Sequence, residues 1–410
     1  MPKPSEWIPL HWPDQSASID WLKGSPVNCL VVNESSADIN RRASALGMDV
    51  APMGALESQV TAIRTAKWPR VPVSARGRSG GVATGPTGAP WVDSNGWISS
   101  LAHAKTPGKP VWIVADPPKD SGMLRSEAYT LAVADAAVYG SRWLISLDSD
   151  LRQGCAAGNS EALLTWRKIG DATRFFEERK AWRSLQPVAK LGVLSDFAGP
   201  NEALAGEVLN LCNRRYLPFR ILDQSTADAK SLQGLKAVLL VQLKEPEVRV
   251  QTLLGEFMRG GGLVIAPSSV AHLASSMTPA GSFENSYDYF SHGEGRVAIA
   301  RKPWTDPYQV ATDAHLLMSR RHDVIRLWNA GSTNAYYTSG PNGGLVQVVN
   351  YATRSFGHPV SLYVAHSYKS AKLRSFSGEA PEPLTVTPRV EGIEVNLPPF
   401  PVYSAIEFGD

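Results

Sequence analysis

The chain has 410 residues, enough for two or three hydrophobic cores, because single cores usually stop growing beyond about 250–300 residues. Its 41 Lys and Arg residues are scattered along the chain and nearly balanced by 38 Asp and Glu residues. The sequence therefore has no basic face for nucleic acid or for an anionic membrane surface, and we expect neither partner.

No apolar stretch of signal-peptide length begins the chain, and no apolar run approaches the ~18 residues that a membrane span needs. The three cysteines, Cys29, Cys155 and Cys212, lack the paired spacing of a disulfide framework or a metal site. We expect a soluble protein without a metal or other cofactor. Its compartment stays open, because a removed leader would leave no trace.

The first part of the chain alternates short apolar runs with helical patterns. Residues 1–25 are rich in Pro and Trp and are expected to be irregular. A strand is predicted over 26–33, a helix over 37–46, which Gly47 ends, and a second strand over 48–53.

The alternation continues to about residue 186. Apolar residues at helical spacing predict a helix over 56–63, and a weaker strand follows over 70–75, where a proline removes one ladder donor. Strands over 111–115 and 141–147 flank a helix that begins at Ser126.

Strands that alternate with helices predict a parallel sheet with helices outside it. We favour a (β/α) TIM-like barrel over an open sheet, because no G-x-G-x-x-G follows the first strand and carboxylates recur at several strand ends. About six strands fit into these residues, whereas eight β/α units usually take ~250 residues. We therefore expect a reduced or distorted barrel.

Carboxylates follow the apolar strands where a parallel barrel binds its ligands. Asp148 and Asp150 end the strand over 141–147, Asp116 ends the strand over 111–115, and Asn33 and Glu34 end the first strand. The C-terminal edge of such strands is the usual place for chemistry. The alternative is that these residues only begin loops or cap helices.

A second candidate lies between the predicted third and fourth strands. Trp91 and Trp97 enclose Asp93 and Asn95, and flat indole faces with nearby polar groups are the parts of a sugar-binding site. The alternative is a hydrophobic anchor that fixes a long loop, with the polar residues bonded inside a turn.

Two further regions follow. Residues 187–335 repeat strands and helices in the manner of a flavodoxin-like α/β domain, without a nucleophile at any strand-to-helix turn. Residues 336–410 contain short alternating strands separated by Gly and Pro, which predicts a small antiparallel β-sandwich. The expected domains are thus 1–186, 187–335 and 336–410.

This three-part order resembles the family 42 β-galactosidases, which combine a barrel, a glutamine-amidotransferase-like α/β domain without its nucleophile and a small C-terminal β domain. The segments that carry the likeness are LGVLSD, FMRGGGLVIAP, GEGRVAIA and GGLVQVVNYATRSFGHPVSLYV. For residues 1–186 the likeness rests on the barrel-like alternation alone. The resemblance implies subunit contacts through the middle domain, so we expect a homo-oligomer that uses residues 187–330.

The chain departs from the family at the catalytic residues. The family uses two glutamates, one of them preceded by asparagine after a mid-barrel strand, whereas the Asn-Glu pair near a strand end here is Asn33-Glu34, after the first strand. No catalytic residue is therefore carried over from the resemblance.

We expect a glycoside hydrolase-like protein with a carbohydrate ligand. Asp148 would donate a proton and Asp116 would be its ionised partner, because glycoside hydrolysis needs two carboxyl groups that face one pocket. Substrate would contact Trp91, Asp93, Asn95, Trp97, Asp150, Asn33 and Glu34. The alternative is a non-catalytic carbohydrate-binding or scaffold protein on a degenerate glycosidase barrel.

Overall fold

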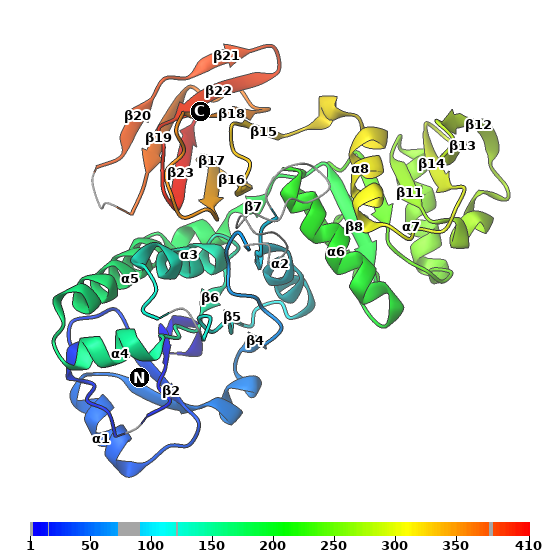
Figure 1. Ribbon diagram of the computed structural model, residues 1–410. Helices are drawn as coiled ribbons and strands as arrows, with labels where there is room; N and C mark the ends of the chain where they lie inside the picture. Colours follow the sequence, from blue (N-terminus) through cyan, green and yellow to red (C-terminus); the bar gives the residue numbers. More distant parts are fainter. Residues whose placement is uncertain (1–2, 15, 73–90, 120–121, 377–379) are drawn as a thin grey trace, which may run out of the picture.

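The computed structural model describes residues 3–14, 16–72, 91–119, 122–376 and 380–410. The chain forms a mixed α/β structure with several separate sheets. In Figure 1 the first 186 residues form one body, the second α/β region lies to its right, and the antiparallel strands lie above α3 and α5.

Six short parallel strands organise the first region. They form two sheets, β1 (Pro9–His11), β2 (Cys29–Val32) and β3 (Asp49–Pro52), and β4 (Thr61–Ile63), β5 (Val111–Ile113) and β6 (Arg142–Trp143). A parallel bridge between Leu10 and Ile145 joins the sheets, because the chain beyond β6 continues alongside β1. The connected order is therefore β3, β2, β1, β6, β5, β4.

No pairing joins β3 to β4 in the part of the chain that the structure describes, so these strands do not form a closed barrel. Helices follow most of the strands, as the alternation predicts. They are α1 (Ala37–Ala45), α2 (Gly96–Lys105), α3 (Ser126–Ala137), α4 (Ser149–Ala156) and α5 (Ser160–Glu178), with 3-10 helices η1 (Pro4–Glu6), η2 (Asp20–Leu22), η3 (Met53–Ser58) and η4 (Lys180–Ser184).

Two sequence predictions fail in this region, and a third is tested only in part. The lead-in is not irregular, because β1 lies within it and begins at Pro9, where a strand tolerates a missing N–H. The helix predicted over 56–63 is wrong: η3 ends at Ser58 and β4 begins at Thr61, although Leu56, Val60 and Ile63 are all buried. Of the strand predicted over 70–75, Arg70 forms one bridge with Asp93, residues 71 and 72 are not in a strand, and residues 73–75 lie outside the described residues.

The second region contains a seven-stranded sheet in the order β12, β13, β14, β11, β10, β8, β9. The five strands from β14 to β9 are parallel, and β12 and β13 add an antiparallel edge. The strands are β8 (Leu191–Ser195), β9 (Phe219–Asp223), β10 (Ala237–Leu240), β11 (Leu263–Ala266), β12 (Thr278–Phe283), β13 (Tyr287–His292) and β14 (Gly295–Ala300).

Helices cover both faces of this sheet. Helices α6 (Pro200–Arg214) and α8 (Pro307–Met318) pack together on one face, and α7 (Val248–Arg259) buries its apolar side on the other. Two 3-10 helices, η5 (Ser268–Ala274) and η6 (Arg320–His322), complete the connections.

The third region contains two antiparallel sheets in the orders β15, β18, β22, β21 and β20, β19, β23, β17, β16, β7. They share one apolar core, in which Val346 and Val348 of β17 meet Leu362 and Val364 of β18. The strands are β7 (Gln186–Pro187), β15 (Ile325–Trp328), β16 (Thr333–Gly340), β17 (Gly343–Asn350), β18 (Val360–Val364), β19 (Ser370–Arg374), β20 (Glu382–Leu384), β21 (Thr387–Arg389), β22 (Gly392–Leu397) and β23 (Tyr403–Gly409). The predicted domain boundaries stay predictions.

A buried carboxyl group connects the first region to these antiparallel strands. Asp135 on α3 is 1% exposed and accepts hydrogen bonds from the Tyr351 hydroxyl at 2.5 Å and from the Asn95 side chain at 2.7 Å. Burial raises the pKa of Asp135 to about 6, although these hydrogen bonds oppose the shift. Asn95 also exchanges hydrogen bonds with the backbone of Lys67, so three segments meet at one carboxyl group.

The raised pKa makes a testable prediction about stability. The folded pKa of about 6 exceeds the ordinary value of 3.8, so the folded state holds this proton more tightly than the unfolded state does. The contribution of Asp135 is therefore greatest below pH ~4, falls as the pH rises to ~6, and changes by about 3 kcal/mol in total. Urea unfolding between pH 4 and 7 should show this slope in wild type and in the exposed control Asp171→Asn, and the slope should be lost in Asp135→Asn.

Candidate functional site

The C-terminal ends of β1, β5 and β6 lie side by side. The His11 amide donates to the Ile145 carbonyl at 2.8 Å, and the Leu144 amide donates to the Ile113 carbonyl at 2.9 Å. These bonds align the ends of the three strands, so the side chains that follow them share one edge. Asp116 is one of those side chains.

A small polar cluster occupies this edge. The Ser146 hydroxyl donates to Asp116 at 2.6 Å, and Asp116 is otherwise exposed. Burial lowers the pKa of His11, while the charge of Asp116 opposes the shift and the charge of Arg152 adds to it. The charges of Asp116 and Arg152 therefore both act on the His11 imidazole. Its Nε2 atom is buried and has no hydrogen-bond partner among the described residues.

Asp148 lies at the same edge but is engaged as a helix cap. Its side chain accepts from the Leu151 amide at 2.7 Å, which satisfies one free N–H of the first turn of α4. The Leu124 amide donates to it at 3.3 Å, and the Tyr129 hydroxyl donates as well. These contacts match the alternative interpretation, in which Asp148 only caps a helix. Adjacent strand ends nevertheless bring Asp148 and Asp116 to one edge.

The other polar residues predicted at strand ends lie farther out. Asp150 is exposed in the first turn of α4 and accepts a weak hydrogen bond from Ser149 at 3.4 Å. Asn33 and Glu34 are exposed just beyond β2. The structure therefore places all three at the same side of the parallel strands.

A cavity of about 180 Å³ opens beside the cluster, between the loop after β1 and helix α4. Trp12, Asp14, Trp21, Arg152 and Gln153 are among its lining residues. Within the described residues, three buried donors there have no partner: the indole Nε1 atoms of Trp12 and Trp21, and Nε of Arg152. Because an unpaired buried donor costs about 1–3 kcal/mol, this concentration is unusual for a structural wall.

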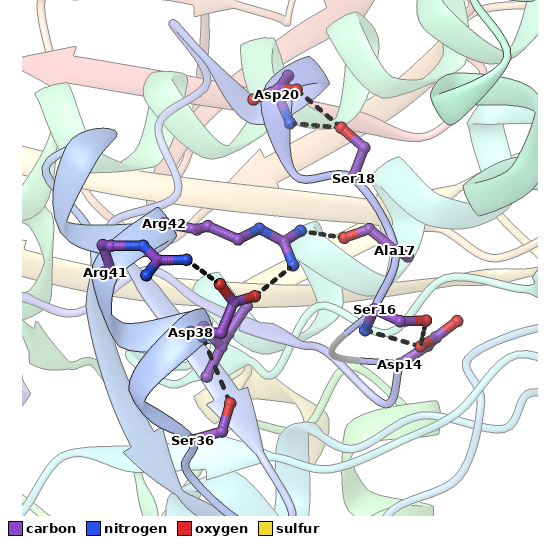
Figure 2. Close-up of polar contacts among 10 residues, drawn as sticks. Asp14, Ser16, Ala17, Ser18, Asp20, Ser36, Asp38, Arg41 and Arg42 are labelled. Atoms are coloured by element: carbon purple, nitrogen blue, oxygen red, sulfur yellow. Dashed lines mark hydrogen bonds and ion pairs between the residues drawn. The ribbon is translucent and has the colours of Figure 1, made fainter.

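The loop that forms one wall is tied to its neighbours. Figure 2 shows the Arg42 guanidinium of α1 donating to the Ala17 carbonyl while it also pairs with Asp38 at 3.3 Å. Asp14 accepts from the amide and the hydroxyl of Ser16, and these bonds lower its pKa. The wall is thus set by contacts with α1, and the Asp14 carboxylate is ionised and open to solvent.

Trp91 and Trp97 lie elsewhere and pack against the core of the second region. A Cβ atom added at Gly206 of α6 would lie 2.8 Å from the Trp97 ring, so the indole rests directly on that helix. Both side chains are half-buried. Their contacts match the loop-anchor alternative.

The polar residues between the two tryptophans are also engaged. Asp93 is 15% exposed and lies 3.8 Å from both Lys67 and Arg70. Asn95 is 2% exposed and belongs to the Asp135 network. Neither is presented to a cavity by these contacts, so substrate binding by this segment stays a prediction.

A substitution at Trp97 distinguishes between a loop anchor and a surface on which a sugar stacks. Trp97→Ala should lower the free energy of unfolding by about 3 kcal/mol, because a large aromatic packed on a helix leaves a void when it is removed. Trp328→Ala is the matched control, since that ring is 45% exposed. Urea unfolding measures both, and an unchanged stability of the Trp97 variant would contradict the anchor.

Several residues of the site escape the sequence analysis. His11, Trp12 and Trp21 fall in the segment expected to be irregular, and Arg152 is one of many scattered arginines. The signal that was available is the apolar run Trp7 to Leu10, which is interrupted only by a proline that a strand accepts at its first residue.

Among the described residues, no group of three or more His, Cys, Asp or Glu side chains is arranged to hold a metal ion. The same residues include no helix that is both long enough and apolar enough to cross a membrane.

No protein-family model matches the chain, and no curated protein matches it by sequence. Solved structures do match. α-L-Fucosidase isoenzyme 2 from Paenibacillus thiaminolyticus superposes with a TM-score of 0.53 and 10% identity, covering 91% of this chain and 70% of that one. The β-galactosidase from Bacillus circulans sp. alkalophilus gives a TM-score of 0.54 and 9% identity, covering 93% and 63%.

A catalytic mutant of Gan42B, a GH42 β-galactosidase from G. stearothermophilus, gives a TM-score of 0.51 at 9% identity, covering 76% of this chain and 56% of that one. The chain thus spans between about half and two thirds of the length of these proteins. The structural likeness to glycoside hydrolases, with family 42 among them, is confirmed. At such identities it is a likeness of fold alone.

Proposed function

We propose that the protein binds carbohydrate at the edge formed by β1, β5 and β6, on a reduced and open form of a glycosidase barrel. The observation that carries this proposal is the cavity whose walls hold three buried donors that have no partner among the described residues. Sugar hydroxyl and ring oxygens are acceptors, so one sugar ring would satisfy donors that the protein leaves unpaired.

The size and composition of the cavity support a single sugar unit. Its volume of about 180 Å³ is below the roughly 300–1,000 Å³ of pockets for drug-sized ligands. Trp21 supplies partly exposed aromatic surface, and the buried Trp12 ring lies next to it, with ring centroids 5.8 Å apart. Asp14 supplies the acceptor that a sugar hydroxyl needs, and Arg152 supplies further donors.

Hydrolysis is the second candidate function, favoured by the placement of Asp116 and Asp148 after adjacent strands. In that reaction Asp148 donates the proton and Asp116 is the ionised partner. Carboxyl groups about 5–5.5 Å apart retain configuration and those about 6.5–9.5 Å apart invert it. The three donors to Asp148 are those of a helix cap, so binding without hydrolysis is the leading proposal.

The expected assembly also stays a proposal. We assign no catalytic group to residues 187–330, so their surfaces are available for contacts between the subunits of a homo-oligomer. Light scattering at micromolar concentration tests it directly.

Binding is tested by one substitution in the cavity. Arg152→Gln should weaken the binding of whichever sugar the wild type takes up by at least about tenfold, because the ligand loses a charged donor. Arg167→Gln is the matched control, since Arg167 is exposed on α5. A screen of mono- and oligosaccharides by thermal shift and calorimetry identifies the ligand, because bound ligand stabilises the fold. Equal affinities in the two variants would remove the cavity from the proposal.

Hydrolysis is tested on aryl-glycosides with Asp148→Asn. An asparagine still caps α4, so the fold should survive, but an amide donates no proton to a leaving group. On any glycoside that the wild type cleaves, turnover should fall by at least ~10²-fold with binding retained. Undiminished turnover excludes Asp148 from the mechanism, and the absence of cleavage by the wild type leaves binding as the function.

A further inference from the structure

A larger groove lies far from the strand edge, where the second region meets the antiparallel strands. It measures about 940 Å³ and is bounded by the end of α6, by α8 and η6, and by β15 with the turn after it. Figure 1 shows α8 and β15 following one another along the chain at this junction. The groove has room for several sugar units, in contrast to the cavity beside β1.

The groove is strongly basic. Four arginines line it, namely Arg214, Arg215, Arg320 and Arg326, against one carboxylate, Asp323. A cleft lined by one sign of charge concentrates the opposite charge from solution. The groove therefore selects anions.

Two of the arginines have structural roles. Arg214 donates to the carbonyls of Thr333 and Gly331 at 3.3 and 3.5 Å. Arg326 pairs with Asp323, the distance from Nε to Oδ2 being 2.9 Å. These two guanidinium groups mainly hold the walls in place.

The other two arginines are available. Arg320 is exposed, and no acidic side chain pairs with it in the described part of the chain. Arg215 lies 5.8 Å from the Tyr308 ring centroid, and its buried Nε has no partner among the described residues. Both line the groove, so their guanidinium groups lie beside whatever occupies it.

A buried histidine supplies the second observation. His315 is 6% exposed, and its Nε2 lies 2.6 Å from Asp323. Its Nδ1 atom is buried and finds no partner in the described residues, although the side chain lines the groove. Burial raises the pKa of Asp323, but the hydrogen bond and charge of His315 and those of Arg326 outweigh it, so the net shift is downward. The carboxylate is thus already neutralised by its own partners and does not repel an anion.

The walls are fixed before any ligand arrives. Tyr216, at a positive φ of 51°, donates to the Ala330 carbonyl and lies 2.8 Å from the Thr333 hydroxyl. These contacts join the end of α6 to the turn after β15. Trp328 lies at the rim with 45% of its surface exposed, which offers a flat apolar face beside the charges.

We propose that this groove binds an acidic oligosaccharide, whose carboxylate or sulfate groups pair with Arg215 and Arg320 while a sugar face stacks on Trp328. The anionic character rests on the groove itself, and the carbohydrate class rests on the proposed function. The groove is a second, extended subsite that holds a charged chain.

The test uses the full chain and defined probes. Calorimetry compares a sulfated tetrasaccharide, a uronate tetrasaccharide, a neutral glucose tetrasaccharide, inorganic sulfate and a short single-stranded DNA. The sulfated or the uronate probe should bind at least tenfold more tightly than the neutral one, with affinity falling as salt rises. The difference between those two probes identifies the anionic group.

Two neighbouring arginines give a matched pair of variants. Arg320→Gln should weaken binding of the acidic probe at least fivefold, whereas Arg321→Gln, on the same 3-10 helix but outside the groove lining, should leave it unchanged. Trp328→Ala should weaken the oligosaccharide and leave inorganic sulfate unaffected. Arg152→Gln should not alter this binding, so failure of the cavity beside β1 is distinguishable from failure here.

Three results would overturn the inference. They are equal binding by the Arg320 and Arg321 variants, tighter binding of DNA than of either acidic glycan, and no binding of an acidic probe at millimolar concentration. Each variant is checked by its melting temperature, and the exposure of Arg320 and Arg321 leaves the fold of both intact.

Discussion

The structure depends on the burial of one carboxyl group. Asp135 lies inside the first region, where an unsatisfied charge would be costly, and the chain meets this demand from two distant segments. Asn95 supplies donors from the start of α2, and Tyr351 supplies one from the end of β17. This network fixes α2 and α3 against the antiparallel strands. The parallel strands then have a firm support on the side away from their C-terminal edge.

Two kinds of polar group lie at or near the C-terminal edge of the parallel strands. Asp148 has its hydrogen-bonding capacity taken up by Leu124, Tyr129 and Leu151, as a structural cap requires. Trp12 and Arg152, a short way off, have buried donors for which the described protein provides no acceptor. Within the described residues, the first group is therefore satisfied and the second is not. Our proposal of a binding site rests on that difference rather than on the number of carboxylates.

Local signals in the sequence predict local structure well. Gly47 follows α1 with a positive φ of 74°, as the sequence predicts, and the structure adds Ser36 as the cap of that helix through the Ile39 amide. The roles of side chains depend on tertiary contacts and are harder to predict. Trp97 has the pattern of a sugar platform, but Gly206, more than a hundred residues away, gives it a surface to pack on. The spacing of Leu56 to Ile63 fits a helix, yet the need to pair Thr61–Ile63 with β5 prevails.

The two-residue strand β7 has a consequence for the order in which the chain folds. After α5 and η4, Gln186 and Pro187 pair with Ser339 and Thr338 of β16, and only then does the chain enter the second sheet. Residues of β17 and β23 also complete the apolar core of the first region, among them Leu345 and Ala405. During synthesis, one face of the first region therefore stays uncovered until β17 and β23 have been made. The contacts of the second sheet are closer in sequence, so that sheet is free to fold first.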